Sequence, residues 1–420
     1  MSKPEGDDTV KDEKTLEAIL DIGKAMIESG AETHRVEDSM YRLCGAYGFE
    51  KCNVWVMPSN IQATVRTPDG EFITQMRHIR SSSMDFAALE RLNALSRSAC
   101  VELPDHGALA ARLSELLAIP QRSPVYIYLA GLLSGLGFGL FFNCGPLDLI
   151  TAALSSLLVC LGVRLLSRIE SNPLIFNFIL SFLCELFILL CIHLGLGTHP
   201  DSITVTVIML LISAMGTANG LRDLVHLDTL SGMVNITVSF TGAIGIALGI
   251  ALPLYLFPGV GESSIARVNP NSLVSLFGAT VGCTGFAYWF RVSGKHVLSC
   301  TLGTAITWLA YLLVWRLGYG VFAASLFAAA VCCAYAQIAA RLHRAPATIF
   351  TAVCVFCLIP GSSLYYMMRG LVIRNAQLAL EKGAELMMIC FAIVLGSMVV
   401  EVLVKLVDSA RRGRAARTKS

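Results

Sequence analysis

Glu185 is the residue in this chain whose position most suggests a role in moving a proton. It lies near the midpoint of an apolar segment that spans about residues 174–196. An ionisable group at the centre of a membrane helix is costly unless it pairs, faces water or takes up a proton. Glu185 is therefore a candidate proton carrier, and a hydrogen bond between two helices is the alternative interpretation.

A second polar group lies between two apolar segments, at about residues 201–219 and 229–256. Arg222 is suited to a carboxylate ligand, because a planar guanidinium can contact both carboxylate oxygens at once. The alternative is an arginine that anchors the inner end of a helix, beside an aspartate that caps the next one. The candidate substrate-binding residues of this stretch are Asn219, Arg222, Asp223, Asp228, Ser231 and Asn235.

A third group follows a helix-breaking pair in the ninth apolar segment. A proline and a glycine interrupt the segment, and a broken membrane helix exposes backbone groups that can contact polar solutes. An ordinary proline kink followed by interfacial tyrosines is the alternative. The candidate transport residues here are Pro360, Gly361, Ser362, Tyr365 and Arg369.

The polar N-terminal part has its own charged cluster at the start of a predicted helix. Acidic side chains in a first turn favour the helix dipole, so capping explains them without any further role. The functional alternative is a gating or regulatory surface formed by Glu32, Arg35, Glu37 and Asp38.

The composition of the chain indicates which kinds of structure hold these candidate residues in place. Hydrophobic residues make up 55% of the chain, charged residues only 15%, and the mean hydropathy is +0.65. Residues 1–122 carry 19 acids and 14 bases, whereas 123–420 carry 11 acids and 18 bases. This asymmetry predicts two environments, and the acidic first part argues against a nucleic-acid-binding arm. The polar first residues do not resemble a signal peptide, so we expect the N-terminal part to stay in the cytoplasm.

Residues 1–122 are predicted to form a small α+β domain. Apolar spacing predicts a helix from about Glu13 to Ser29 and a second helix with Thr33 as its N-cap. Three short strands follow at 53–58, 61–67 and 71–79, separated by turn-forming residues. Two more helices are predicted at 84–96 and 107–117.

Ten apolar segments follow, most of them near the roughly 20 residues that a helix needs to cross a bilayer. The segments lie at about 125–143, 147–166, 174–196, 201–219, 229–256, 272–290, 296–315, 320–340, 346–366 and 384–406. The distribution of basic residues places both termini inside, including a basic tail at 411–420. The loop with Arg369 and Arg374 departs from that distribution, because it is predicted to lie outside.

The membrane region matches itself when it is shifted by 147 residues. Arg222 then meets Arg369, and all five apolar segments of 123–260 meet those of 270–410. A repeat with five spans must insert in the opposite sense to its predecessor. The sequence therefore predicts ten transmembrane helices as two five-helix inverted repeats, with a solute path between them.

Four long motifs resemble the threonine/serine exporter family, and the resemblance runs from about Leu16 to Val407. These motifs are GAETHRVEDSMYRL (30–43), PSN (58–60), GLRDLVHLDTLSG (220–232) and RAPATIFTAVCVFCLIPGSSLYYMMRGL (344–371). The chain is similar to the single-chain form of the family, whose two-component relatives are linked to succinate export. The resemblance implies a multi-pass protein of a bacterial inner membrane that uses the proton motive force. Asn235 stands where the family usually has a basic residue, which leaves amino acids and dicarboxylates both open as substrates.

The leading hypothesis is thus a proton-coupled secondary exporter of small polar metabolites of the threonine/serine type. A succinate-like dicarboxylate exporter and a channel or uptake carrier for the same solutes are the alternatives. The expected partners are the solute, protons and the lipid bilayer, with no nucleic acid. Glycine-rich segments one and five are also compatible with a homo-oligomer interface. No catalytic set, cofactor motif or metal-ligand spacing is evident, and the absence of a Walker A motif argues against direct use of ATP.

Overall fold

The computed structural model describes most of the chain, in several ranges. These are residues 5–80, 83–120, 123, 125–167, 169–170, 172–212, 216, 220, 223–224, 228–257, 268–269 and 271–417. The chain divides into two compact units. One contains residues 1–122 with two short stretches of the later chain, 229–234 and 290–293, and the other contains the remainder.

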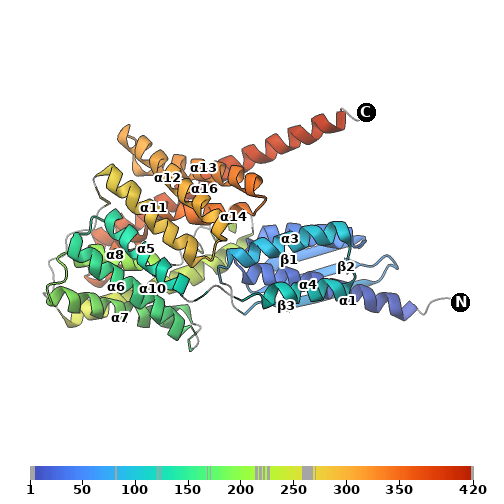
Figure 1. Ribbon diagram of the computed structural model, residues 1–420, viewed down its shortest axis with the longest axis horizontal. Helices are drawn as coiled ribbons and strands as arrows, with labels where there is room; N and C mark the ends of the chain where they lie inside the picture. Colours follow the sequence, from blue (N-terminus) through green and yellow to red (C-terminus); the bar gives the residue numbers. More distant parts are fainter. Residues whose placement is uncertain are drawn as a thin grey trace. The chain divides into compact units, whose positions relative to one another are not determined.

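The first unit is a three-stranded antiparallel sheet with four helices (Figure 1). Its elements are α1 (Glu5–Glu28), α2 (Thr33–Ala46), β1 (Lys51–Met57), β2 (Asn60–Arg66), β3 (Phe72–His78), α3 (Phe86–Glu102) and α4 (His106–Ala118). The strands pair in the order β1-β2-β3. Met57 pairs with Asn60, so Pro58 and Ser59 form the two-residue turn of a tight hairpin. The positive φ of Gly70, 90°, is the conformation that only glycine adopts freely in the second turn.

The core of this unit lies between the sheet and the first two helices. Alternate residues of β1 and β2 are buried, as expected for a sheet with one covered face. They pack against α1 and α2, whose apolar stripes are fully buried. Gly23 lets α1 pack closely on α2, because a Cβ atom at this position would lie only 2.8 Å from Sδ of Met40 on α2.

Three sequence-based boundaries in this unit were wrong. The helix predicted at 84–96 begins at Phe86 and continues to Glu102. The first helix begins at Glu5 instead of Glu13. Its first two turns lack an apolar stripe, so hydrophobic periodicity did not predict them. In α2 the N-cap is Glu32 and Thr33 is already helical, since the backbone of Glu32 is extended at φ −70° and ψ 138°.

All regular secondary structure in the described residues of the second unit is helical. Its elements are α5 (Val125–Phe141), α6 (Pro146–Leu166), α7 (Pro173–His193), α8 (Pro200–Leu211), α10 (Thr229–Leu256, whose first residues group with the first unit), α11 (Ser272–Trp289), α12 (Gly294–Arg316), α13 (Val321–His343), α14 (Ala347–Cys354), a short 3-10 helix (Val355–Leu358), α15 (Gly361–Val372) and α16 (Ala376–Arg417). Proline is the first residue of α6, α7 and α8, where it has no intrahelical hydrogen bond to lose.

Six of the described helices are long and apolar enough to cross a membrane, and a bent pair of helices would make a seventh. The bent pair is 347–358 with 361–371, and its two parts meet at 52°. The break lies at Ile359 and Pro360, one residue before the predicted Pro360–Gly361 pair, and Gly361 already begins α15. Two shorter apolar helices, α5 and α8, accompany these spans. The full count of ten spans stays a prediction.

The helix boundaries repeat along the chain. Val125, Pro200 and Thr229, which begin α5, α8 and α10, lie 147 residues before the first residues of α11, α14 and α16. The helices α5 and α11 also pack directly against each other. Ala130 lies beside Gly285, and Phe141 lies beside Gly278, so the two helices run antiparallel.

The glycines of α5 and α10 have neighbours within the same chain. A Cβ atom at Gly137 would meet the backbone of Gly282 on α11, and one at Gly131 would meet Cys160 on α6. On α10, Gly245 lies equally close to the backbone of Leu174 on α7. Close packing of helices in one subunit therefore accounts for these glycines.

Candidate functional site

A buried ion pair connects α8 with α15, two helices from different halves of the sequence repeat. Nη1 of Arg369 donates to Oδ1 of Asp201 over 2.7 Å, and the hydroxyl of Tyr365 donates to the same oxygen over 3.1 Å. Tyr365 and Arg369 lie four residues apart on α15, so both side chains point from one face of that helix. Asp201 is in the first turn of α8 and Arg369 in the last turn of α15, the ends at which their charges suit the helix dipoles.

Glu185 extends this cluster from a third helix. Its Oε2 accepts a 2.9 Å hydrogen bond from the hydroxyl of Thr204, which lies one turn after Asp201 on α8. The Glu185 side chain is only 2% exposed, and it lies within electrostatic range of both Asp201 and Arg369. The cluster thus contains two carboxyl groups and, in the part of the chain that the structure describes, one guanidinium that faces them.

A cavity of about 760 Å³ lies against the same residues of α15. Its wall is mostly apolar and comes from α8, α10 and α15, and includes Ile208, Ala247 and Leu364. Tyr365 and Arg369 supply polar groups to this wall. A hollow of this size, with a few polar groups in an apolar wall, is typical of sites that bind small molecules.

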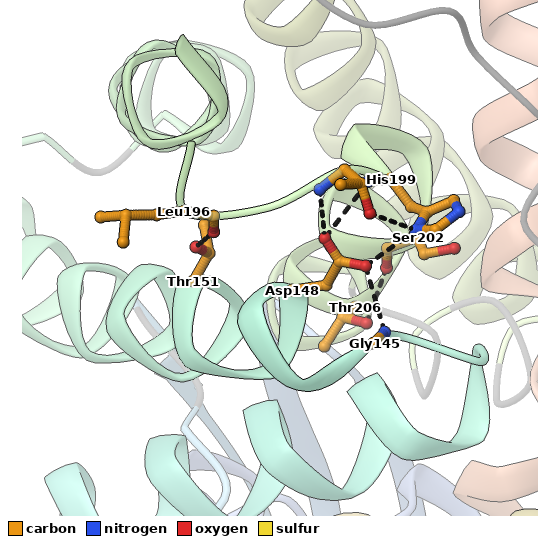
Figure 2. A network of polar contacts seen from close by, with 8 residues as sticks. Gly145, Asp148, Thr151, Leu196, His199, Ser202 and Thr206 are labelled. Carbon is orange, nitrogen blue, oxygen red and sulfur yellow. Dashed lines mark hydrogen bonds and ion pairs between the residues drawn. The ribbon is translucent and has the colours of Figure 1, made fainter. Parts of the chain in front are cut away.

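A separate polar network fixes the start of α8, as Figure 2 shows. Asp148, near the start of α6, is 1% exposed. Its Oδ1 accepts from the backbone N–H groups of Thr198 and His199 at 2.6 and 3.2 Å. Its Oδ2 accepts from the backbone of Gly145 at 3.1 Å and contacts Nδ1 of His199 at 2.9 Å. Asp148 therefore holds the loop from which α8, and with it Asp201, begins.

A comparison with models of known protein families identifies the family of this chain. The model of the threonine/serine exporter ThrE matches residues 17–257, and a second model, described as "Threonine/Serine exporter, ThrE", matches residues 275–403. The chain belongs to the threonine/serine exporter family. No curated protein and no solved structure matches it. The family exports small solutes, and this chain has several apolar helices. Together these findings support a multi-pass membrane protein that exports a small solute.

Three of the candidate transport residues predicted from the sequence lie close together in the structure: Glu185, Tyr365 and Arg369. Gly361 lies close by and packs against Met209 of α8, so a side chain there would displace the methionine. A Cβ atom at Gly361 would lie 2.5 Å from Sδ of Met209. Pro360 is buried at the break, and Ser362 is half-buried in the first turn of α15.

The candidate group around Arg222 is described only in part. Asn219 and Arg222 lie outside the described residues. Asp223 is buried, and its Oδ2 accepts a 3.0 Å hydrogen bond from the side-chain amide of Asn235 on α10. The backbone N–H of Asp228, just before α10, donates to the carbonyl of Asp223 over 2.9 Å.

Ser231 is the remaining member of this predicted group. It is buried in the first turn of α10.

The charged cluster of the first unit has structural partners. Glu32 pairs with Arg35 at 3.1 Å along the first turn of α2. Glu37 accepts a 3.1 Å hydrogen bond from the backbone N–H of Val56, so it joins α2 to strand β1. Asp38 is exposed. The gating role predicted for these four residues stays a prediction.

Sequence reasoning missed Asp201, Thr204 and Asp148. Each lies at or near the start of an apolar segment, and such a residue resembles an ordinary helix cap. The signal that was present is the pair Pro200–Asp201, an acidic group directly after a proline that begins a helix. Among the described residues, no group of three or more histidine, cysteine or acidic side chains could hold a metal ion.

Proposed function

We propose that this chain is a secondary active exporter of small polar metabolites, of the threonine and serine type, driven by the proton motive force. Its membership of the threonine/serine exporter family supports the solute class. The single structural observation that carries the proposal is the Asp201–Arg369 pair, which joins the two halves of the repeat beside a cavity of about 760 Å³.

We further propose that the membrane region is two inverted five-helix repeats in a bacterial inner membrane, with both termini in the cytoplasm. The spacing of 147 residues between matching helix starts supports the repeat. The antiparallel packing of α5 on α11 supports the inversion, because matching helices of inverted repeats run in opposite senses. In such a carrier the halves rock against each other and expose the site to one side at a time.

Within this scheme Arg222 and Arg369 lie near opposite mouths, and Glu185 carries the coupling proton. The burial of Glu185 and its single described hydrogen bond, from Thr204, support that role. A buried carboxyl that gains and loses a proton changes the charge of the cluster by one. That change would alter the attraction between Glu185 and Arg369 in each half of the cycle.

An export assay tests this function. The full chain is expressed in a bacterial strain that lacks its threonine exporters, and the release of preloaded threonine is followed with and without an uncoupler. We expect the uncoupler, Arg222→Ala and Glu185→Gln each to reduce export strongly. Glu381→Gln is the matched control, because this carboxyl is exposed at the start of α16. Unchanged export in both Arg222→Ala and Glu185→Gln would contradict the assigned roles.

Counterflow in proteoliposomes separates the alternatives. An exporter of amino acids exchanges threonine or serine and responds to an imposed proton gradient. A dicarboxylate exporter exchanges succinate instead, and a channel carries the solute without counterflow or proton coupling. Export of succinate but not of threonine would replace the leading proposal with its first alternative.

A further inference from the structure

One oxygen of the buried Asp201 carboxylate has no partner among the described residues. Oδ1 accepts from both Arg369 and Tyr365, whereas Oδ2 is buried without a hydrogen bond. The residue is only 5% exposed. A buried polar atom without a partner costs about 1–3 kcal/mol, and more when it is charged. The site around Asp201 is therefore incomplete without a further group.

The charges of the cluster indicate what kind of group is missing. When Glu185 has released its proton, Asp201 and Glu185 carry two negative charges and Arg369 carries one positive charge. A cationic group beside Oδ2 of Asp201 would balance them and supply the missing donor. The ammonium group of an amino acid has both properties, with three N–H donors and one positive charge.

The cavity gives a solute access to the other member of the pair. Arg369 and Tyr365 line its wall, and they are the two groups that hold Oδ1 of Asp201. A solute carboxylate that enters the cavity therefore meets the guanidinium that holds the Asp201 carboxylate, although Asp201 itself is not among the described wall residues. A guanidinium binds either carboxylate with the same donor geometry.

We propose that Asp201 and Arg369 together bind the charged groups of an α-amino acid, with its ammonium on Asp201 and its carboxylate on Arg369. This assignment rests on the proposed function and names the substrate class of that site. Binding replaces the one ion pair between α8 and α15 by two pairs with the solute. The contact between the halves is then broken only when the solute is present.

The same arrangement discriminates against a dicarboxylate. The first carboxylate of such a solute would be attracted to Arg369. Its second would meet Asp201 and Glu185, two groups of like charge in a site with little water. A solute with one carboxylate and one ammonium group avoids this repulsion, so we expect amino acids to bind in preference to succinate.

A binding experiment with matched ligands tests the assignment on the purified full chain in lipid nanodiscs. The ligands are L-threonine, 3-hydroxybutyrate, which lacks the ammonium group, and 1-amino-2-propanol, which lacks the carboxylate. We expect 3-hydroxybutyrate and 1-amino-2-propanol each to bind the wild type about 10-fold or more weakly than L-threonine does, the usual cost of a lost charge-assisted hydrogen bond. Succinate should bind more weakly than threonine.

The variants then show which residue contacts which group. In Asp201→Asn we expect threonine binding to weaken by about 10-fold and 3-hydroxybutyrate binding to stay within about 3-fold of wild type. In Arg369→Gln we expect threonine binding to weaken by about 10-fold and 1-amino-2-propanol binding to stay within about 3-fold of wild type. A merely structural Asp201 would weaken threonine and 3-hydroxybutyrate equally, which overturns the assignment. Tighter binding of both ligands to Asp201→Asn also overturns it, since Asp201 would then only compete with the solute.

Two controls keep the result clear. Thermal unfolding of each variant without ligand shows whether it folds. If Asp201→Asn does not fold, the wild-type ligand series decides alone, and equal binding of threonine and 3-hydroxybutyrate overturns the proposal. If the wild type exports no threonine or serine in cells, the proposed function fails. If it exports them but binds threonine no better than 3-hydroxybutyrate, only the Asp201 assignment fails.

Discussion

Two buried aspartates in the first turns of neighbouring helices have very different surroundings. Asp148 of α6 receives donors at both oxygens, three from the backbone and one from His199. Asp201 of α8 has two donors at one oxygen, both side chains of α15, while its other oxygen has no partner among the described residues. A carboxylate with donors at both oxygens stabilises a fold, whereas one with a free oxygen can accept a further donor, which in our proposal is the ammonium group of the solute.

The largest expected effect is on stability, at Asp148. In Asp148→Ala the N–H groups of Gly145, Thr198 and His199 lose a buried, charged acceptor, although Thr198 and His199 are themselves exposed. We expect a loss of about 3 kcal/mol in the free energy of unfolding, because three hydrogen bonds to one charged group disappear together. Thermal unfolding in detergent measures it, and an unchanged midpoint would show that water replaces the carboxylate.

The next largest effect concerns the ion pair of the second aspartate. Arg369→Gln leaves Asp201 and Glu185 without their cation, so we expect a loss of about 2 kcal/mol. The double variant Asp201→Asn/Arg369→Gln should recover most of that stability but not transport. Thermal unfolding and export of the two single variants and the double variant form the cycle. A double variant as unstable as the sum of its parts would show that the pair is not coupled.

Tyr365→Phe removes one neutral donor from Asp201 and leaves the arginine in place. We expect a change of about 1 kcal/mol in the free energy of unfolding and a several-fold loss in export. The matched control is Tyr319→Phe, an exposed tyrosine outside the helices. Equal losses of stability and export in both variants would show that the hydrogen bond from Tyr365 to Asp201 does not cause them.

The smallest effect is expected at His199, whose side chain is 52% exposed. His199→Ala removes one of four donors to Asp148 and leaves the three backbone donors unchanged. Solvent screening reduces the contribution of this exposed group, so we expect about 0.5 kcal/mol or less. A loss comparable to that of Asp148→Ala would mean that the histidine side chain, not the backbone, holds the network together.

Much of the fold was readable from residue patterns. The three strands lie within two residues of their predicted positions, because alternating apolar residues between turn-forming pairs specify a hairpin locally. The break at Pro360 was equally predictable, since proline cannot continue the helix before it. The predicted segment at 201–219 contains α8 as far as Leu211, and most of its remaining residues lie outside the described ranges.

Sequence by itself determined the family, the small α+β unit, the apolar helices and three members of the site: Glu185, Tyr365 and Arg369. Only the tertiary structure decided that Asp201 faces Arg369, 168 residues later in the chain. An aspartate after a helix-initiating proline has the same local appearance whether it caps a loop or pairs across two halves of a bundle. Its role depends on which donors the packing of distant helices brings to each oxygen, and local sequence does not encode that.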